Sequence, residues 1–182
     1  MRNQLGPEAW VEAGLAALRD SGVDGVRVER LAQALKVTKG SFYWHFKDRA
    51  ALLDAMLQAW RRRATFAVID EVETCGGDAV QRLRQLSTVV GRIEGRLDLA
   101  VRAWAGQDAE AKAALDEIDR RRLDYLASLF RELPFSPAEA RARARLVYHA
   151  LIGELTIGEH VSSAERLAER FEIIIPMLTR RP

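Results

Sequence analysis

Apolar residues recur every three or four positions along most of the chain, with polar residues between them. This is the spacing of an amphipathic helix that buries one face. It predicts helices near residues 7–20, 28–35, 38–46, 48–63, 65–73, 78–94, 97–106, 109–132, 137–158 and 163–179. Glycine, proline and serine residues punctuate these segments, and no alternating pattern of useful length predicts a strand. The expected fold class is therefore all-α.

Two of the predicted helices, 28–35 and 38–46, are short and are separated by Lys36 and Val37. Two short helices joined by a tight turn form a helix-turn-helix, whose second helix enters the major groove of DNA. Apolar residues such as Leu31 can pin the two helices together and leave the start of the second one free. The spacing thus predicts a helix-turn-helix.

The helix over 38–46 begins with small and polar residues and continues with aromatic and basic ones. In order, these residues are Thr38, Lys39, Gly40, Ser41, Tyr43, Trp44, His45 and Lys47. The N–H groups and the dipole at a helix start favour phosphate, and a glycine there lets the backbone approach closely. Hydroxyl, indole, imidazole and ammonium groups add hydrogen-bond donors. This composition favours a surface that faces DNA.

Basic charge is concentrated in the same stretch. The 182 residues carry a formal net charge of only +2, and residues 1–50 account for all of it. Residues 25–47 hold five bases and one acid, a net charge of +4. Such a stretch can face phosphate, although a solvated basic face explains the charge equally well. A structural protein that bends DNA would need basic charge over more surface than the neutral remainder offers.

The overall composition indicates one compact unit, or a small module fused to a larger one. Hydrophobic residues make up 48% of the chain and charged residues 30%, which is enough apolar material for a core. No run approaches 18 apolar residues, and the first thirty residues do not resemble a secretory signal. The single cysteine, Cys75, cannot form an internal disulfide. We therefore expect a soluble, cytoplasmic protein without a membrane partner.

The case for an enzyme is weak. His149 and His160 lie eleven residues apart, which is roughly 16 Å along a continuous helix and too far to share one metal ion. There is no Gly-x-Ser-x-Gly motif or phosphate-binding loop. Cys75 has no identifiable base partner, so an unreactive linker cysteine is favoured over a redox sensor. We expect no catalytic residues, no metal and no cofactor.

Residues 31–53 resemble the DNA-binding signature of the tetracycline-repressor (TetR) family. Their sequence is Leu-Ala-Gln-Ala-Leu-Lys-Val-Thr-Lys-Gly-Ser-Phe-Tyr-Trp-His-Phe over residues 31–46, followed by Lys-Asp-Arg-Ala-Ala-Leu-Leu to Leu53. The resemblance covers about residues 7–56. It implies a helix-turn-helix DNA-binding domain over residues 1–48. It also implies a helical ligand-binding and dimerisation domain over residues 49–182, reached through the fourth helix.

The resemblance also assigns positions at the DNA. The residues expected there are Arg27, Val28, Thr38, Lys39, Gly40, Ser41, Tyr43, Trp44, His45, Lys47 and Arg49. Tyr43, Lys47 and the start of the second helix are similar to phosphate contacts of the family, whereas Phe42 and Phe46 are similar to its core residues. For Trp44 the alternative is a packing role.

Three positions depart from the family pattern. Lys36 stands in the turn where the family usually has glycine, and it destabilises the turn if the backbone there is left-handed. Arg27 stands where Ser or Thr usually caps the second helix, and an arginine cannot accept hydrogen bonds from the helix N–H groups. Arg49 replaces a lysine at the start of the fourth helix, which keeps the charge and changes the geometry.

The rest of the chain contains no motif that defines a ligand. Residues that can line a pocket are Trp60, Phe66, Trp104, Tyr125, Tyr148 and His149, and at helical spacing such residues are more often core. A strong apolar stripe on the last two helices resembles the family's four-helix dimer interface. It comprises Val147, Leu151, Leu155, Leu167, Phe171, Ile174, Ile175 and Leu178. The alternative is that these residues form only the core of their own chain.

The function implied by the resemblance is a homodimeric DNA-binding transcriptional regulator. It would be a repressor that a small-molecule effector releases from a palindromic operator in double-stranded DNA. An activator or a ligand-independent regulator remains an alternative, and an enzyme a remote one. The fourth helix, from about Asp48 to Arg63, would connect the ligand-binding domain to the DNA-binding domain.

Overall fold

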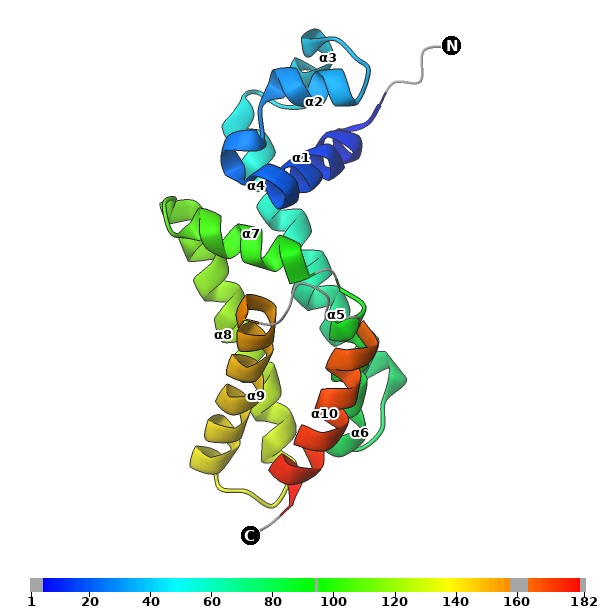
Figure 1. Cartoon of the computed structure of the whole chain (residues 1–182), viewed down its shortest axis with the longest axis vertical. Coiled ribbons are helices and arrows are strands. Elements are labelled where there is room, and N and C mark those ends of the chain that lie inside the picture. The colour runs from blue at the N-terminus through cyan, green and yellow to red at the C-terminus, as the bar shows by residue number, and fades with distance from the viewer. Residues whose placement is uncertain (1–4, 94, 158–163, 181–182) are drawn as a thin grey trace. The chain divides into compact units, whose positions relative to one another are not determined.

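The computed structural model of the protein describes residues 5–93, 95–157 and 164–180, and for residues 164–168 and 170 it describes the helix but not the side chains. Over these residues the chain is all-α and contains no strand, as the periodicity predicts. The helices are α1 (Pro7–Ser21), α2 (Val28–Ala34), α3 (Lys39–Tyr43), α4 (Arg49–Arg61), α5 (Ala67–Cys75), α6 (Ala79–Gly91), α7 (Gly95–Ala105), α8 (Ala109–Arg131), α9 (Pro137–Ile157) and α10 (Ala164–Thr179) (Figure 1). None of the described helices is both long and apolar enough to cross a membrane.

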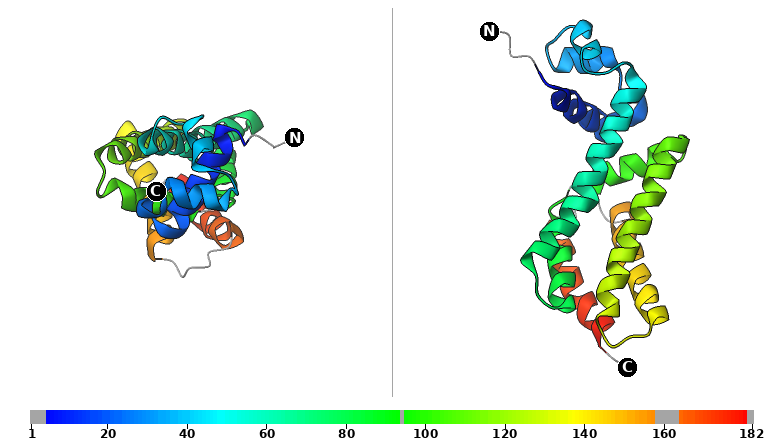
Figure 2. Two further views of the ribbon diagram at one scale, coloured as in Figure 1. Left: turned by 90° about the horizontal axis from the view of Figure 1, so that it is seen from above. Right: turned by 180° about the vertical axis from the view of Figure 1, so that it is seen from behind.

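The junction between α4 and α5 differs from the prediction. Two separate helices were expected, with the first ending near Arg63. Instead α4 continues through a π-helical turn, η2 (Arg62–Phe66), directly into α5, and the run of helix can be followed in Figure 2. The physical reason is local, because the sequence has no glycine or proline at this junction to end the helix.

The Cα packing divides the chain into two units. The first comprises the residues up to Arg62 together with Arg96–Leu115, and the second comprises Arg63–Gly95 and the residues from Asp116 onward. The predicted functional division between residues 48 and 49 concerns the roles of the two parts and stays a prediction.

Helix ends are set by local chemistry. Gly22 ends α1 with φ +68°, a conformation that glycine adopts without strain. Asp48 caps α4, and its carboxylate accepts a hydrogen bond from the amide of Ala51. Thr38 occupies the N-cap position of α3, but its side chain makes no capping hydrogen bond. That helix also ends at Tyr43 rather than near Phe46.

The core of the second unit lies between α6, α8, α9 and α10. Its buried side chains include Leu83, Leu126, Phe130, Tyr148 and Phe171. Helix α10 packs against α6, and α6 packs against α5. Helices α9 and α10 run antiparallel (Figure 1). In keeping with this, Arg143 near the start of α9 donates from Nη1 to the carbonyl of Leu178 near the end of α10, at 2.8 Å.

The apolar stripe on α9 and α10 faces this core, which corrects part of the predicted dimer interface. The side chains of Val147, Phe171 and Ile175 are buried against residues of α6 and α8 in the same chain. Leu151 and Leu178 are partly buried and pack against the same core. The physical reason is that two helices of the same chain already cover this side of the stripe.

The remaining three residues of the stripe differ in their surroundings. Ile174 is half-buried, Leu155 packs over Gly95, and the side chain of Leu167 lies outside the described residues. Their place in a dimer interface stays a prediction. Among the described side chains of α10, the large apolar ones that are exposed are Ile173 and Met177.

Candidate nucleic-acid interface

A single aromatic residue anchors the short helix α3 to the first unit. Phe42 is completely buried, with its ring edge-to-face against Trp10 of α1 at a centroid distance of 5.2 Å. Phe46 stacks on Phe42 at 5.5 Å and is also buried. Both residues are therefore core residues, as predicted. Because α3 is buried through Phe42, the remaining sides of this helix are left to solvent.

Most of the predicted DNA-facing residues lie on the solvent side of this motif. Trp44 is 87% exposed and Tyr43 is 62% exposed. An indole with that exposure is not a packing residue, so the alternative role for Trp44 is wrong. Thr38, Lys39, Gly40, His45 and Lys47 are exposed, as are Arg27 and Arg49, whereas Val28 and Ser41 are half-buried. The structure thus brings polar, aromatic and basic side chains together at the N-terminal end of α3 and just after it.

The turn between α2 and α3 has the left-handed conformation that the sequence analysis considered. Lys36 has φ +56°, and no other non-glycine residue in the described part of the chain has a positive φ. The amide of Val37 donates to the carbonyl of Ala32 at 3.0 Å, and the amide of Lys36 donates to Gln33 at 3.1 Å. These two bonds form a Schellman motif, in which glycine is the favoured residue at the position of Lys36. The lysine therefore strains a turn that is otherwise regular.

Lys39 is held by an acidic neighbour on α2. Its Nζ atom lies 2.6 Å from Glu29 Oε1, and both side chains are more than half exposed. The hydrogen bond from Lys39 lowers the pKa of Glu29 below its usual value. An exposed ion pair of this kind contributes little to stability. Lys39 can therefore exchange Glu29 for another anion at small cost.

Two arginines at the predicted interface also bind the chain's own backbone. Arg49 donates from Nε to the carbonyl of Val26 and from Nη2 to that of Val23, both at 2.6 Å. It thereby ties the start of α4 to the segment that precedes α2. Arg27 occupies the N-cap of α2 without a side-chain cap, as expected, and donates to the carbonyl of Asp24 at 3.0 Å. Sequence reasoning missed the role of Arg49 because its acceptors are carbonyls, which leave no signal in the side-chain pattern.

Gly40 is not required by the packing of the protein. A Cβ atom placed on it would have Thr38 Oγ1 at 3.6 Å as its nearest neighbour, an ordinary van der Waals contact. Its backbone is not in the left-handed region either. A glycine weakens a helix relative to alanine. Its presence at this exposed helix start is therefore unexplained by the fold and is consistent with a partner that approaches the backbone closely.

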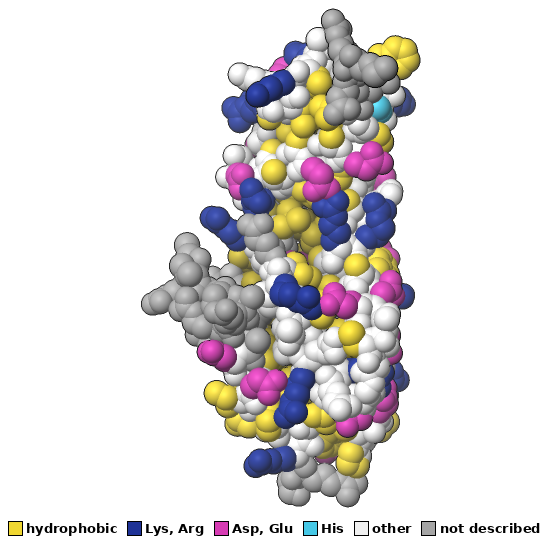
Figure 3. All heavy atoms as spheres, turned by 90° about the vertical axis from the view of Figure 1, so that its right-hand side faces the viewer, with side chains coloured by type: hydrophobic (Ala, Val, Ile, Leu, Met, Phe, Trp, Pro, Cys, Tyr) yellow, Lys and Arg dark blue, Asp and Glu magenta, His cyan; other side chains and the backbone are white. Residues whose placement is uncertain are grey.

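Charge elsewhere on the surface is mixed. On the face drawn in Figure 3, Lys and Arg side chains are interspersed with Asp and Glu rather than gathered in one continuous field. This pattern matches the net charge of zero outside residues 1–50. The basic excess that can attract phosphate is thus restricted to the stretch that contains the helix-turn-helix.

The residues predicted to line a ligand pocket divide between the two units. Trp60 and Trp104 belong to the first unit, where both are buried core residues. In the second unit, Phe66 packs under the guanidinium of Arg121, and Tyr125 donates to the carboxylate of Glu73 at 2.7 Å. The burial of the Tyr125 hydroxyl, followed by its hydrogen bond to Glu73, raises its pKa. His149 is exposed on α9.

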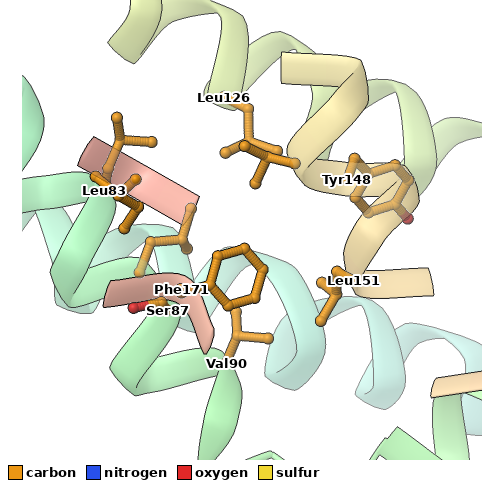
Figure 4. Close-up of a pocket in the computed structure, with 10 residues that line it drawn as sticks. Leu83, Ser87, Val90, Leu126, Tyr148, Leu151 and Phe171 are labelled. Atoms are coloured by element: carbon orange, nitrogen blue, oxygen red, sulfur yellow. The ribbon is translucent and has the colours of Figure 1, made fainter. Parts of the chain in front are cut away.

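Tyr148, another residue of the predicted set, lines a cavity. This cavity lies in the second unit between α6, α8, α9 and α10, and Figure 4 shows Tyr148 facing Leu126, Phe171 and Leu151 across it. Sequence reasoning did not identify its aliphatic walls, because apolar residues at helical spacing carry no signal that separates a cavity wall from filled core.

Among the side chains that the structure describes, no group of three or more His, Cys, Asp or Glu residues could hold a metal ion. Cys75 is a free, exposed thiol at the end of α5. His160 lies outside the described residues.

Comparison with known proteins places the helix-turn-helix in a family. Residues 11–56 match the model of a family described as bacterial regulatory proteins, tetR family. The class C tetracycline repressor protein of Escherichia coli is 44% identical over 57 residues, which are 31% of this chain. The aligned region spans only 26% of that repressor. The HTH-type transcriptional regulator BetI of Cronobacter sakazakii is 28% identical over 150 residues, covering 78% of this chain and 71% of that protein.

The likeness to solved structures extends over the whole fold. A transcriptional regulator from Rhodococcus sp. Rha1 has a TM-score of 0.79 with 20% sequence identity, and the match covers 98% of this chain and 100% of that one. At this identity the match establishes the fold and nothing about the ligand.

Proposed function

We propose that the chain is a member of the TetR family of bacterial regulatory proteins, whose model matches residues 11–56, and that it is a sequence-specific DNA-binding transcriptional regulator. The observation that supports this proposal most directly is the anchoring of α3 by Phe42, which leaves Lys39, Tyr43 and Trp44 exposed on one short helix and its end. Phosphate contacts position such a helix on the duplex, and contacts to base edges select the sequence.

The proposed regulator acts as a homodimer on a palindromic operator. One copy of α3 is too short to read more than a few base pairs, so two copies would read two half-sites about one or two helical turns apart, near 34–36 Å per turn. The exposed apolar side chains on α9 and α10, which include Leu146, Ile173 and Met177, support a surface for a second copy. Burying such side chains between two copies would remove them from water.

The proposed regulatory step is release from DNA by a small molecule. A ligand changes the affinity for DNA only if it binds the two states of the protein differently. By reciprocity, DNA must then weaken binding of the ligand by the same factor, commonly about 5–150-fold. Such a ligand makes the protein a repressor whose target genes are expressed when the ligand accumulates.

Selection from random DNA followed by binding measurements tests the proposal. The selected sequences should contain inverted half-sites, and insertion of half a helical turn between them should abolish tight binding. Recovery of single, unpaired sites would contradict the dimeric reader. Binding without any sequence preference would contradict specific regulation altogether.

A further inference from the structure

We propose that the cavity between α6, α8, α9 and α10 is the effector site and that its ligand is an uncharged, largely apolar molecule. This inference rests on the proposed function, since it names the ligand class of the proposed release step. Eight of the ten lining residues are aliphatic side chains or phenylalanine. The cavity holds about 50 Å³ of free space, which is larger than the space that a single water molecule needs, about 10–15 Å³.

The two polar side chains in the wall are turned to partners within the protein. Ser87 Oγ donates to the carbonyl of Arg84 at 2.6 Å. Tyr148 Oη donates to Asp119 Oδ1 at 2.6 Å and accepts from Arg122 Nη1 at 3.2 Å. Figure 4 shows both hydroxyl oxygens on the outer side of their side chains, away from Phe171. The space itself is thus bounded by hydrocarbon.

This wall excludes charged and strongly polar ligands. A charged group placed there would lose its hydration without gaining a partner, which is costly in an apolar interior. The lining of such an apolar cavity lacks contacts on one side until a guest supplies them. Leu86, Val90 and Leu151 are only half-buried, so the wall that they form is accessible from solvent. An apolar guest that enters through this wall therefore gains contacts with the lining.

Tyr148 provides the reason to regard the cavity as an effector site. Its ring lines the cavity, while its hydroxyl shares a hydrogen bond with Arg122. Arg122 in turn donates to Thr65 Oγ1 at 2.9 Å and to the carbonyl of Ala64 at 3.1 Å, both in the π-helical turn η2. A guest that displaces the Tyr148 ring thus acts on the turn that directly follows α4 in the chain. It therefore has a physical route to the segment that joins the two units.

The test uses toluene as a neutral probe and benzoate as its charged counterpart, on the full chain. Toluene should raise the midpoint of thermal unfolding in a saturable way, and benzoate should not. The variant Val90→Phe fills the cavity from its accessible wall and should abolish the effect of toluene. The variant Leu151→Ala enlarges the cavity and should extend binding to propylbenzene. Equal effects of toluene on the wild type and on Val90→Phe, or equal binding of benzoate, would overturn the assignment.

A second measurement separates this inference from the proposed function. Toluene at saturation should lower the affinity for a selected operator by about fivefold or more, and Val90→Phe should bind that operator normally without responding. Binding of toluene with no change in operator affinity would overturn the effector role while leaving DNA binding intact. Absence of any operator binding without toluene would instead overturn the proposed function.

Discussion

Arg122 of α8 donates a hydrogen bond from Nη2 to the backbone carbonyl of Ala64 at 3.1 Å. Ala64 lies in the π-helical turn η2, where backbone hydrogen bonds shift from the fourth to the fifth residue along the helix. Helical turns of this kind are frequent at functional sites. The arginine therefore adds hydrogen bonds from α8 to an irregular turn, one to the carbonyl of Ala64 and one to Thr65 Oγ1.

Replacement of this arginine should destabilise the second unit. Arg122→Met removes the hydrogen-bond donors to Ala64, Thr65 and Tyr148 at once. Each buried acceptor that is left unpaired lowers the free energy of unfolding by about 1–3 kcal/mol. Denaturant unfolding measures the change. The matched control is Arg120→Met, an exposed arginine two residues away on the same helix, which should change stability by less than about 0.5 kcal/mol. Equal losses in both variants would contradict the role of Arg122.

Gly40→Ala should separate stability from DNA binding. The substitution adds a methyl group where the protein leaves room, so the free energy of unfolding should rise by about 0.5–1 kcal/mol. Operator affinity should fall, because the methyl group would stand between the helix start and the DNA backbone. Gly153→Ala is the control, since a Cβ at Gly153 meets no neighbour within 4 Å and this glycine lies far along the chain in α9. Unchanged operator affinity in Gly40→Ala would show that DNA does not approach this glycine.

Lys36→Gly should stabilise the helix-turn-helix. The left-handed conformation at φ +56° costs a residue with a Cβ atom about 1 kcal/mol or more, whereas glycine adopts it freely. Part of that gain is offset by the greater flexibility of glycine in the unfolded chain, so we expect a net gain of about 0.5–1 kcal/mol. Lys36→Ala keeps the strain and removes the charge, and it should show no gain in thermal unfolding. A gain in both variants would point to charge rather than strain.

Glu29→Gln should strengthen binding to DNA. The carboxylate holds Lys39 at 2.6 Å and places a negative charge on the predicted interface, so its removal frees the lysine for phosphate or bases. The gain should be present at low salt and fade as salt rises, because exposed charges are screened. Glu110→Gln removes an exposed acid elsewhere in the first unit and should have little effect. A loss of affinity in Glu29→Gln would mean that the ion pair positions Lys39 for DNA.

The double variant Ile173→Glu, Met177→Glu should yield a folded monomer. The side chains of Ile173 and Met177 are 68% and 70% exposed, so their replacement leaves the core of the unit intact. The two glutamates place negative charge on the proposed dimer surface. Phe171→Arg, by contrast, places a charge in the core and should unfold the unit, since burying an unpaired charge costs several kcal/mol. Light scattering gives the mass and circular dichroism the helix content. A stable dimer in the double variant would locate the interface on another surface.

The sequence by itself determined the helices and the location of the DNA-binding motif. Helical periodicity and end signals such as Gly22 and Asp48 are local, so they can be read without knowing what packs against what. The same holds for the burial of Phe42, because one apolar face of a short helix has to face the rest of the domain. For Lys36 the family resemblance raised only the condition of a left-handed backbone, and the structure supplied the conformation, with φ +56°.

Only the tertiary structure decided which surface covers each apolar stripe. Phe171 and Ile175 lie at a helical spacing that interface residues and core residues share. The packing of α6 and α8 against them makes them core residues. In the same way, the partners of Arg49 and Arg122 are backbone carbonyls brought close by folding, and neither contact is encoded by side-chain pattern. The cavity beside Tyr148 depends on how four helices fail to fill the space between them. Contacts between residues distant in sequence are set by packing, which periodicity along the chain does not specify.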